Sequence, residues 1–331
     1  MDSIKMEIRN AERNIWAILA TLALALLFSV ATKAQTPADW QKMKGDINLF
    51  MANDLGRNGY YDQKPIAQLM GEMAEEIGPE AIIAAGDIHH FNGVASVDDP
   101  LWMTNYELIY SHPELMIDWM PVLGNHEYRG NTQAVMDYSR VSRRWMSGER
   151  YYSRVFRSEK KGVTLRIVFI DTTPLITRYR NESDVYPDAC RQDADRQLAW
   201  LDSTLAAAKE DWVVVAGHHP IYAQTTKNSD EREDMQRRLL PILQKHRNVA
   251  IYACGHIHNF QHIRKPGDPI EYVVNSAGSL SRKVKPTDGT VFCSPEPGFS
   301  VISATKTSLS LYMIDKNGNN IHEVNIVQPL K

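Results

Sequence analysis

The stretch VAIYACGHIH, residues 249–258, joins a short apolar run directly to a pair of histidines. The apolar part, Val249 to Ala253, is typical of a buried strand. Because side chains alternate along an extended chain, His256 and His258 are expected to project from the same side at the end of this strand. Neutral imidazole is a common metal ligand, so the pair can hold a metal where carboxylates converge on it. Taken in isolation, however, two such histidines are better explained as polar loop residues.

Apolar, strand-like segments alternate with helical patterns along most of the chain. Strands are expected at 46–52, 81–85, 119–123, 165–170, 212–216 and 249–253. Helices are expected at 65–77, 101–110, 193–208 and 235–245, and Pro241 either starts or kinks the last of them. Beyond Pro266, antiparallel strands are expected at 271–275, 299–304, 309–314 and 321–327, with Asn317-Gly318 as a hairpin turn. This order predicts an α/β sandwich with its site at the strand ends.

Polar clusters follow several of these strands, and most have a glycine next to or near them. The clusters are Asp54; Asp87 with His90; Asn125 with His126; His218; and His256 with His258. Glycine lets the backbone turn tightly and approach a site closely. Separate loop-capping residues would explain each cluster alone, but their succession favours one shared site. A set of carboxylates and imidazoles of this size suits two metal ions with one bridging aspartate.

The composition is that of an ordinary globular protein. The chain has 331 residues, of which 43% are hydrophobic and 23% are charged, so it is long enough for a large core. The net charge of −3 gives no basic excess, and we therefore expect no nucleic-acid partner. The sequence does not indicate an oligomeric state.

The first 34 residues are predicted to be a signal peptide. Lys5, Arg9 and Arg13 precede an uncharged apolar run at 15–31, and cleavage is expected after Ala34. An uncleaved membrane anchor is the alternative, because the run is slightly long. Residues 35–331 are expected to form one exported domain, periplasmic or secreted, with no other membrane contact.

Three cysteines, Cys190, Cys254 and Cys293, are too few and too scattered for a disulfide framework. Cys254 lies in an apolar strand and is expected to be buried. The sequence leaves open whether Cys190 and Cys293 form a disulfide bond.

The motifs together resemble those of the calcineurin-like metallophosphoesterases, and within them the small purple acid phosphatases of the tartrate-resistant type. The motifs are D-x-G at 54–56, GD at 86–87, GNHE at 124–127, GH at 217–218 and GHIH at 255–258. Similar stretches include YSRVSRRW at 138–145, LAWL at 198–201 and VVVAGH at 213–218, so the resemblance covers nearly all of the chain after the signal peptide. It implies a four-layer αββα sandwich.

The resemblance also implies a role for each site residue. Asp54, Asp87, His90 and His258 would surround one metal, and Asp87 would bridge to a second metal held by Asn125, His218 and His256. The ions would be iron, zinc or manganese. A metal-bound hydroxide would attack the phosphorus of a small phosphate monoester, with Asp87 and His126 as the catalytic residues. Asn125 and His126 would also contact the substrate.

Two departures from the family pattern concern the ligands and the substrate contacts. The family has a tyrosine three residues after the bridging aspartate, where this chain has His90. It also has a substrate-contacting histidine at the position of Lys227, and a tyrosine is usual at that of His219. Lys227 is predicted to attract phosphate, or else to lie in a flexible surface loop, and His219 is predicted to face the substrate.

Other functions remain open from the sequence. The same metals serve phosphodiesterases and nucleotide pyrophosphatases, and a non-catalytic metal- or phosphate-binding protein is an alternative of another class. His126 argues against the last, because binding alone needs no acid at the leaving group. An unrelated zinc peptidase is disfavoured, because the chain has no His-Glu-x-x-His motif.

Overall fold

The computed structural model describes residues 36–226 and 229–328. These residues all belong to one compact unit, Gln35–Lys331. The predicted signal peptide and Lys227 lie outside the described residues. Within the described part, no helix combines the length and the apolar character that crossing a bilayer requires.

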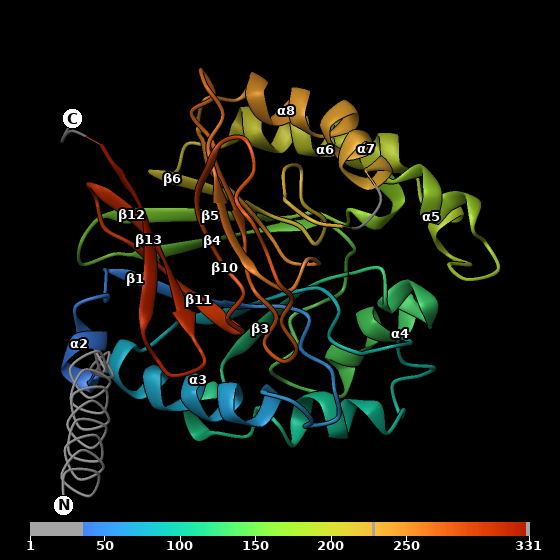
Figure 1. Ribbon diagram of the computed structural model, residues 1–331, viewed down its shortest axis with the longest axis horizontal. Coiled ribbons are helices and arrows are strands. Elements are labelled where there is room, and N and C mark those ends of the chain that lie inside the picture. The colour runs from blue at the N-terminus through green and yellow to red at the C-terminus, as the bar shows by residue number, and fades with distance from the viewer. Residues whose placement is uncertain (1–35, 227–228, 329–331) are drawn as a thin grey trace, which may run out of the picture. The chain divides into compact units, whose positions relative to one another are not determined.

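The described strands form two mixed sheets, shown near the middle of Figure 1. The first has the order β13 (Asn320–Val327), β12 (Ser308–Asp315), β11 (Gly298–Ala304), β1 (Ile47–Ala52), β2 (Ala81–Ala85) and β3 (Asp118–Val122). The second has the order β10 (Thr290–Ser294), β8 (Phe260–Ile263), β9 (Glu271–Val274), β7 (Val249–Cys254), β6 (Trp212–Ala216), β5 (Val163–Phe169) and β4 (Tyr152–Ser158). The strands that precede the predicted site, β1–β2–β3 and β6–β7, are parallel neighbours within their sheets.

Alternation along each central strand divides its side chains between two apolar layers. In β1, Leu49 and Met51 join Val214 of β6 in the core between the sheets. Phe50, between them in sequence, belongs instead to the cluster that includes the helices, as does Val213 of β6. Because both faces of each central strand are covered, every residue of β1, β2 and β6 is buried. β2 and β6 are continuous apolar runs, and β1 is apolar except for Asn48, which accepts a hydrogen bond from the Gly45 backbone nitrogen.

Helices cover the outer faces of the two sheets, which gives four layers (Figure 1). On one side lies α3 (Gln63–Ile77), whose residues Ile66, Met70 and Met73 are buried. On the other side lie α6 (Ala194–Ala207), α7 (Asp230–Arg238) and α8 (Leu240–Lys245). Shorter helices are α2 (Pro37–Gln41), α4 (Thr132–Asp137), α5 (Thr177–Asn181), a π-helical turn at Met103–Glu107 and 3₁₀ turns at Pro113–Leu115, Glu127–Arg129, Tyr138–Arg140, Thr173–Leu175 and Ala189–Arg191. The predicted αββα sandwich is confirmed.

Several local predictions are corrected by the structure. The expected helix at 235–245 is two helices, and Pro241 lies in the first turn of α8, where its missing N–H costs nothing. The helix expected at 101–110 is shorter than predicted, because its last helical residue is Glu107. The strand expected to be antiparallel at 271–275 is β9, which pairs in parallel with β7 and antiparallel only with β8.

Three strands of the structure show no recognisable strand pattern in the sequence. β4 and β10 lie at the two ends of the second sheet, and several of their residues are only partly buried. β8 has only four residues. Edge and very short strands carry no long apolar run, so their pairing is decided by the strand beside them. The described cysteines are all free, and Cys254 is buried as expected.

Candidate metal centre

Loops that follow β1, β2, β3, β6 and β7 bring the predicted ligands together. Ligand atoms of Asp54, His90 and His258 lie within 4.8 Å of one another, and so do those of Asp54, Asp87 and His218. All five side chains are buried, in loops up to 204 residues apart in sequence (54 to 258). The structure therefore gathers residues that the sequence shows only as separate strand-end motifs.

Four residues of the predicted site have a backbone conformation that is rare for residues with a Cβ. Asp54, Asp87, His256 and His258 have φ angles of 51°, 55°, 72° and 64°. Left-handed conformations of non-glycine residues are costly and persist where the surrounding structure requires them, often at functional sites. The strain supports a role for these four residues beyond filling the core.

One glycine of the motifs is required by close packing. A Cβ placed on Gly124 would lie 2.2 Å from Oδ1 of Asp87 and 2.6 Å from its backbone nitrogen. Both atoms are fixed within the cluster, so any side chain at position 124 would displace Asp87. The glycine expected from the sequence to allow close approach thus has a specific neighbour, the central aspartate.

Hydrogen bonds to the backbone select the ring nitrogen that each histidine can offer to a metal. Nδ1 of His218 lies 2.9 Å from the carbonyl oxygen of Ala85, and Nδ1 of His258 lies 2.7 Å from that of Leu280. Because a carbonyl oxygen only accepts, both Nδ1 atoms carry hydrogen, and Nε2 is left with its lone pair. Such outer contacts fix the tautomer of metal-binding histidines.

The free nitrogens face carboxylates, which is the arrangement that a cation would stabilise. Nε2 of His218 lies 3.1 Å from Oδ2 of Asp87, and Nε2 of His258 lies 3.0 Å from Oδ1 of Asp54. A lone pair facing a carboxylate oxygen is repulsive unless a proton or a metal ion sits with them. Although burial opposes it, the Asp87 carboxylate raises the pKa of His218 to about 9. Burial likewise opposes ionisation of Asp54, yet His258 holds its pKa well below the usual range. The donor set therefore fits bound cations.

Two further predicted ligands have buried polar atoms without partners. Neither ring nitrogen of His90 makes a hydrogen bond, and Nε2 lies 3.5 Å from Oδ2 of Asp87. Oδ1 of Asn125 is also buried without a hydrogen-bond partner. Buried polar groups without partners are uncommon, and an ion is one of the standard explanations. Both side chains are thus free to coordinate a metal.

Glu127 is a supporting residue whose role the sequence did not reveal, although it belongs to the GNHE motif. Its fully buried carboxylate accepts hydrogen bonds from the backbone nitrogens of Asp87 and Ile88, both at 2.8 Å, and of Gly124 at 2.7 Å. These bonds tie the loop after β2 to the loop after β3. Burial, together with the Asp87 charge, raises the pKa of Glu127 to about 7.

Glu231 of α7 is a second supporting residue, and it belongs to none of the sequence motifs. Its Oε2 lies 2.9 Å from Nε2 of His256, and its Oε1 accepts a hydrogen bond of 2.7 Å from the Tyr179 hydroxyl. The carboxylate therefore accepts the hydrogen of Nε2 and fixes the His256 ring beside those of His218 and His219. Only the packing of α7 against the second sheet brings these residues together.

We expect Glu231→Gln to weaken metal binding about 10- to 100-fold, as is typical when a carboxylate behind a ligating histidine is lost. The amide can no longer accept with full charge from His256. Competition with a metal chelator measures the affinity, and the exposed Glu233→Gln on the same helix serves as the control. Equal affinities in the two variants would contradict the role of Glu231.

The contacts of His219 differ from those that a substrate-facing residue needs. Its side chain is fully buried, with Nδ1 2.8 Å from the Thr172 hydroxyl and Nε2 3.3 Å from that of Tyr179. Its ring packs 4.3 Å from that of His256, centroid to centroid. His219 thus packs against His256, and one of its ring nitrogens lies within 4.8 Å of ring nitrogens of His218 and His256. The sequence could not show on which side of the loop this residue lies.

A cavity of about 360 Å³ opens beside the cluster. Its walls include three predicted site residues and three arginines: Asn125, His126, His256, Arg129, Arg178 and Arg282, with Phe91, Tyr179, Tyr186 and Glu231. His126 lies 3.8 Å from Asp87 through Nε2, while its Nδ1 donates to the carbonyl oxygen of Phe91 at 2.6 Å. Nε2 is therefore the nitrogen of His126 that can act in the cavity.

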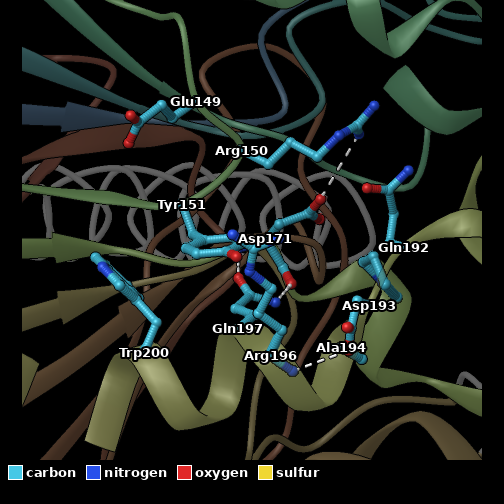
Figure 2. Close-up of a pocket in the computed structure, with 11 residues that line it drawn as sticks. Glu149, Arg150, Tyr151, Asp171, Gln192, Asp193, Ala194, Arg196, Gln197 and Trp200 are labelled. Atoms are coloured by element: carbon cyan, nitrogen blue, oxygen red, sulfur yellow. Dashed lines mark hydrogen bonds and ion pairs between the residues drawn. The ribbon is translucent and has the colours of Figure 1, made fainter. Parts of the chain in front are cut away.

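A separate cavity of about 640 Å³ lies beside the end of β5 (Figure 2). Tyr151 and Trp200 line one side, with ring centroids 5.0 Å apart. Asp171 follows β5 in the same way that the ligands follow their strands, but its carboxylate accepts a hydrogen bond from the Tyr128 hydroxyl. Its backbone is held by Gln197 through bonds of 2.7 and 2.8 Å. No predicted site residue lines this cavity.

Comparison with characterised proteins agrees with the geometry of the cluster. Residues 43–260 match the calcineurin-like phosphoesterase family. Purple acid phosphatase 17 of Arabidopsis thaliana is 30% identical over 276 residues, which cover 78% of this chain and 79% of that protein. Tartrate-resistant acid phosphatase type 5 of Oryctolagus cuniculus is 33% identical over 217 residues, 65% of this chain and 66% of that protein.

Solved structures show the same fold at lower identity. The Plasmodium protein described as GAP50, the anchor in the inner membrane complex, is 21% identical with a TM-score of 0.73, over 86% of this chain and 90% of its own. Purple acid phosphatase PPD1 from Lupinus luteus is 15% identical with a TM-score of 0.60, over 85% of this chain and 53% of its own. With a family match over residues 43–260 and a clustered set of metal-binding side chains, the chain belongs to the calcineurin-like phosphoesterase family, and purple acid phosphatases are among its homologues.

Proposed function

We propose that this protein is a dinuclear-metal phosphoesterase that hydrolyses small phosphate monoesters. The observation that carries the proposal is the buried cluster of carboxylates and imidazoles, whose free ring nitrogens face carboxylates beside an arginine-lined cavity. The homologous purple acid phosphatases support the reaction class.

One metal would be held by Asp54, Asp87, His90 and His258, and the other by Asp87, Asn125, His218 and His256. Two bound cations supply Lewis-acid charge that neutralises phosphate oxygens and makes water nucleophilic at moderate pH. Iron, zinc and manganese all suit imidazole and carboxylate ligands, and the donor set does not choose among them.

The chain's own residues bind and orient the substrate around this charge. Arg129, Arg178 and Arg282 line the cavity and attract the anionic phosphoryl group. His126 presents Nε2 to the cavity, and this nitrogen can hand a proton to the leaving oxygen when the ring is protonated. Asn125 contributes its amide at the same wall. Lys227 remains a predicted phosphate contact.

The sequence of residues 1–34 supports export, so we propose that the enzyme acts in the periplasm or outside the cell. Its partners would be small phosphorylated molecules rather than nucleic acid, in keeping with the net charge of −3.

The proposal is tested with metal-stripped and metal-reloaded protein on matched monoester and diester substrates. We expect close to two metals per chain, no hydrolysis after stripping, recovery on reloading, and faster hydrolysis of monoesters. Faster diester hydrolysis would favour a phosphodiesterase. Full metal occupancy without turnover of any ester would favour a binding protein.

The replacement of the family's tyrosine by His90 predicts the colour and metal preference of the site. A neutral imidazole removes one negative charge from the ligand set and favours divalent ions over trivalent iron. We expect iron-loaded wild type to be colourless, active with divalent metals and insensitive to mild oxidants, with a pH optimum nearer neutral than strongly acid. His90→Tyr should gain a visible tyrosinate-to-iron band. Such a band in the wild type, measured by absorption spectroscopy, would mean that another tyrosine reaches the metal.

A further inference from the structure

The cavity at the end of β5 combines an aromatic wall with buried polar groups (Figure 2). Its volume of about 640 Å³ is ample for a small organic molecule, since such sites usually measure roughly 300–1,000 Å³. The segment before β4 contributes Tyr151, the segment after β5 contributes Asp171, and α6 contributes Trp200. No predicted ligand of the metal centre lies in its walls, so the cavity is separate from the proposed active site.

Two rings form the aromatic wall. The ring centroids of Tyr151 and Trp200 are 5.0 Å apart, and the ring planes are tilted by 52°. Both residues are partly buried, and both lie on the same side of Asp171 in Figure 2. Gln197, about one helical turn before Trp200, bonds the backbone nitrogen and the backbone oxygen of Asp171 at 2.7 and 2.8 Å. This turn of α6, and with it the Trp200 ring, is therefore fixed beside Asp171.

Asp171 supplies a buried acceptor at this cavity. The residue is 1% exposed, and its Oδ2 accepts a hydrogen bond from the Tyr128 hydroxyl. Its Oδ1, by contrast, is buried without a hydrogen-bond partner. Burial raises the pKa of Asp171 to about 7, which reflects the cost of charging the carboxyl group here. A donor from a bound molecule would satisfy Oδ1 and remove part of that cost.

Arg150 lies near the same carboxyl group, but its guanidinium already has partners. Nη1 donates to the Tyr128 hydroxyl at 3.1 Å and lies 4.0 Å from Oδ2 of Asp171. Nη2 donates to the hydroxyl oxygen of Thr132 at 2.8 Å and to Oδ2 of Asp188 at 2.5 Å. Because Asp188 offsets the charge of Arg150, an anionic ligand would gain little from this guanidinium.

The remaining polar groups give the cavity no strong preference for either sign of charge. Glu149 and Asp193 bring negative charge to the walls, and Arg196 brings positive charge. The N-terminus of α6 is already capped, because Oδ1 of Asp193 accepts a 2.9 Å hydrogen bond from the Arg196 backbone nitrogen. Gln192 donates through Nε2 to the Asp188 carbonyl oxygen at 3.1 Å, so its Oε1 can accept from a ligand. A neutral molecule that both donates and accepts fits these walls better than an ion.

We propose that this cavity binds a neutral saccharide. A pyranose ring has an apolar C–H face that can pack on Tyr151 and Trp200, and its hydroxyl groups both donate and accept hydrogen bonds. One hydroxyl would donate to Oδ1 of Asp171 and another to Oε1 of Gln192. The inference does not depend on the proposed phosphoesterase function, because this cavity shares no lining residue with the one beside the metal cluster. The protein would thus hold a glycan at one site and act on an ester at another.

Calorimetric titration of the metal-loaded protein with glucose, N-acetylglucosamine and maltose tests the site. We expect saturable binding of at least one of these sugars, and none of glycerol, which has hydroxyl groups but no ring. Tyr151→Leu and Trp200→Leu should each raise the Kd about two- to tenfold, because leucine keeps apolar volume but loses the flat ring face. Tyr60→Leu removes a tyrosine ring that is 72% exposed in another cavity, so it is the matched control and should leave the Kd unchanged.

Asp171→Asn tests the polar contact separately. The amide keeps the shape of the side chain, but its neutral oxygen is a weaker acceptor, so the Kd should rise about tenfold. Thermal midpoints show whether each variant is folded. The two leucine variants probe the same ligand independently, so either of them decides the question if another variant fails to fold.

Absence of saturable saccharide binding by the wild type would overturn the inference, and so would a single Kd shared by the wild type and all the cavity variants. Glycerol binding as tight as that of the sugars would exclude a role for the ring face. Displacement of the sugar by inorganic phosphate would place it at the metal centre instead. Saturable binding of tetramethylammonium in place of the sugars would reassign the cavity to an organic cation. Removal of the metals should abolish ester hydrolysis and leave saccharide binding intact, which separates this site from the proposed function.

Discussion

Asp87→Asn is expected to lower metal occupancy below two per chain and to reduce ester hydrolysis by at least about a thousandfold, because the metals supply most of the charge that the reaction needs. Asp87 occupies the centre of the cluster. Its Oδ2 lies 3.1 Å from Nε2 of His218 and 3.5 Å from that of His90, and its Oδ1 accepts the backbone hydrogen bond of His126 at 2.9 Å. An amide keeps the shape and can keep the last bond, but it loses the negative charge shared between two cations.

Elemental analysis and steady-state kinetics on the same preparation check this expectation. Asp98→Asn, which changes an exposed aspartate in the loop after β2, controls for expression and handling. Circular dichroism should show that the Asp87 variant folds. Full activity at reduced occupancy, or wild-type activity in protein that carries no metal, would exclude a bridging role for Asp87.

His126→Ala is expected to lower turnover of alkyl phosphates by about 10²- to 10⁴-fold, the usual contribution of a positioned acid. Nε2 is the nitrogen of His126 that can protonate the leaving oxygen, because Nδ1 donates to the Phe91 carbonyl oxygen and the residue lines the cavity. Aryl phosphates with good leaving groups need less protonation, so their loss should be smaller. Metal content should stay at the wild-type value, since His126 is not a proposed ligand.

A series of esters with leaving groups of graded pKa measures this difference. Turnover that falls equally across the series would show that His126 only positions the substrate. A loss of bound metal in the same variant would instead place His126 among the ligands, in line with its Nε2 lying 3.8 Å from Oδ2 of Asp87.

The fold class and the strand-end positions of the candidate site follow from the sequence alone, because both depend on local patterns. β1, β2 and β6 are buried on both faces. β2 and β6 appear as uninterrupted apolar runs, β1 is interrupted only by Asn48, and α3 shows its inward face at helical spacing. A polar residue one glycine beyond the end of such a strand has little freedom in where it can lie. Asp87 and His218 could therefore be singled out before any contact was known.

The residues that support the site were decided by the tertiary structure. Glu231 meets His256 only because α7 packs beside the second sheet, and Arg57 meets the Phe91 ring only because the loops after β1 and β2 lie side by side. Neither contact leaves a local pattern, since the partners are 25 and 34 residues apart and the intervening chain sets their distance. The same holds for His219, whose neighbours Thr172 and Tyr179 come from the segment after β5. Local sequence specifies which groups stand at the strand ends, whereas the packing of helices on the sheets determines which atoms of those groups remain free to bind.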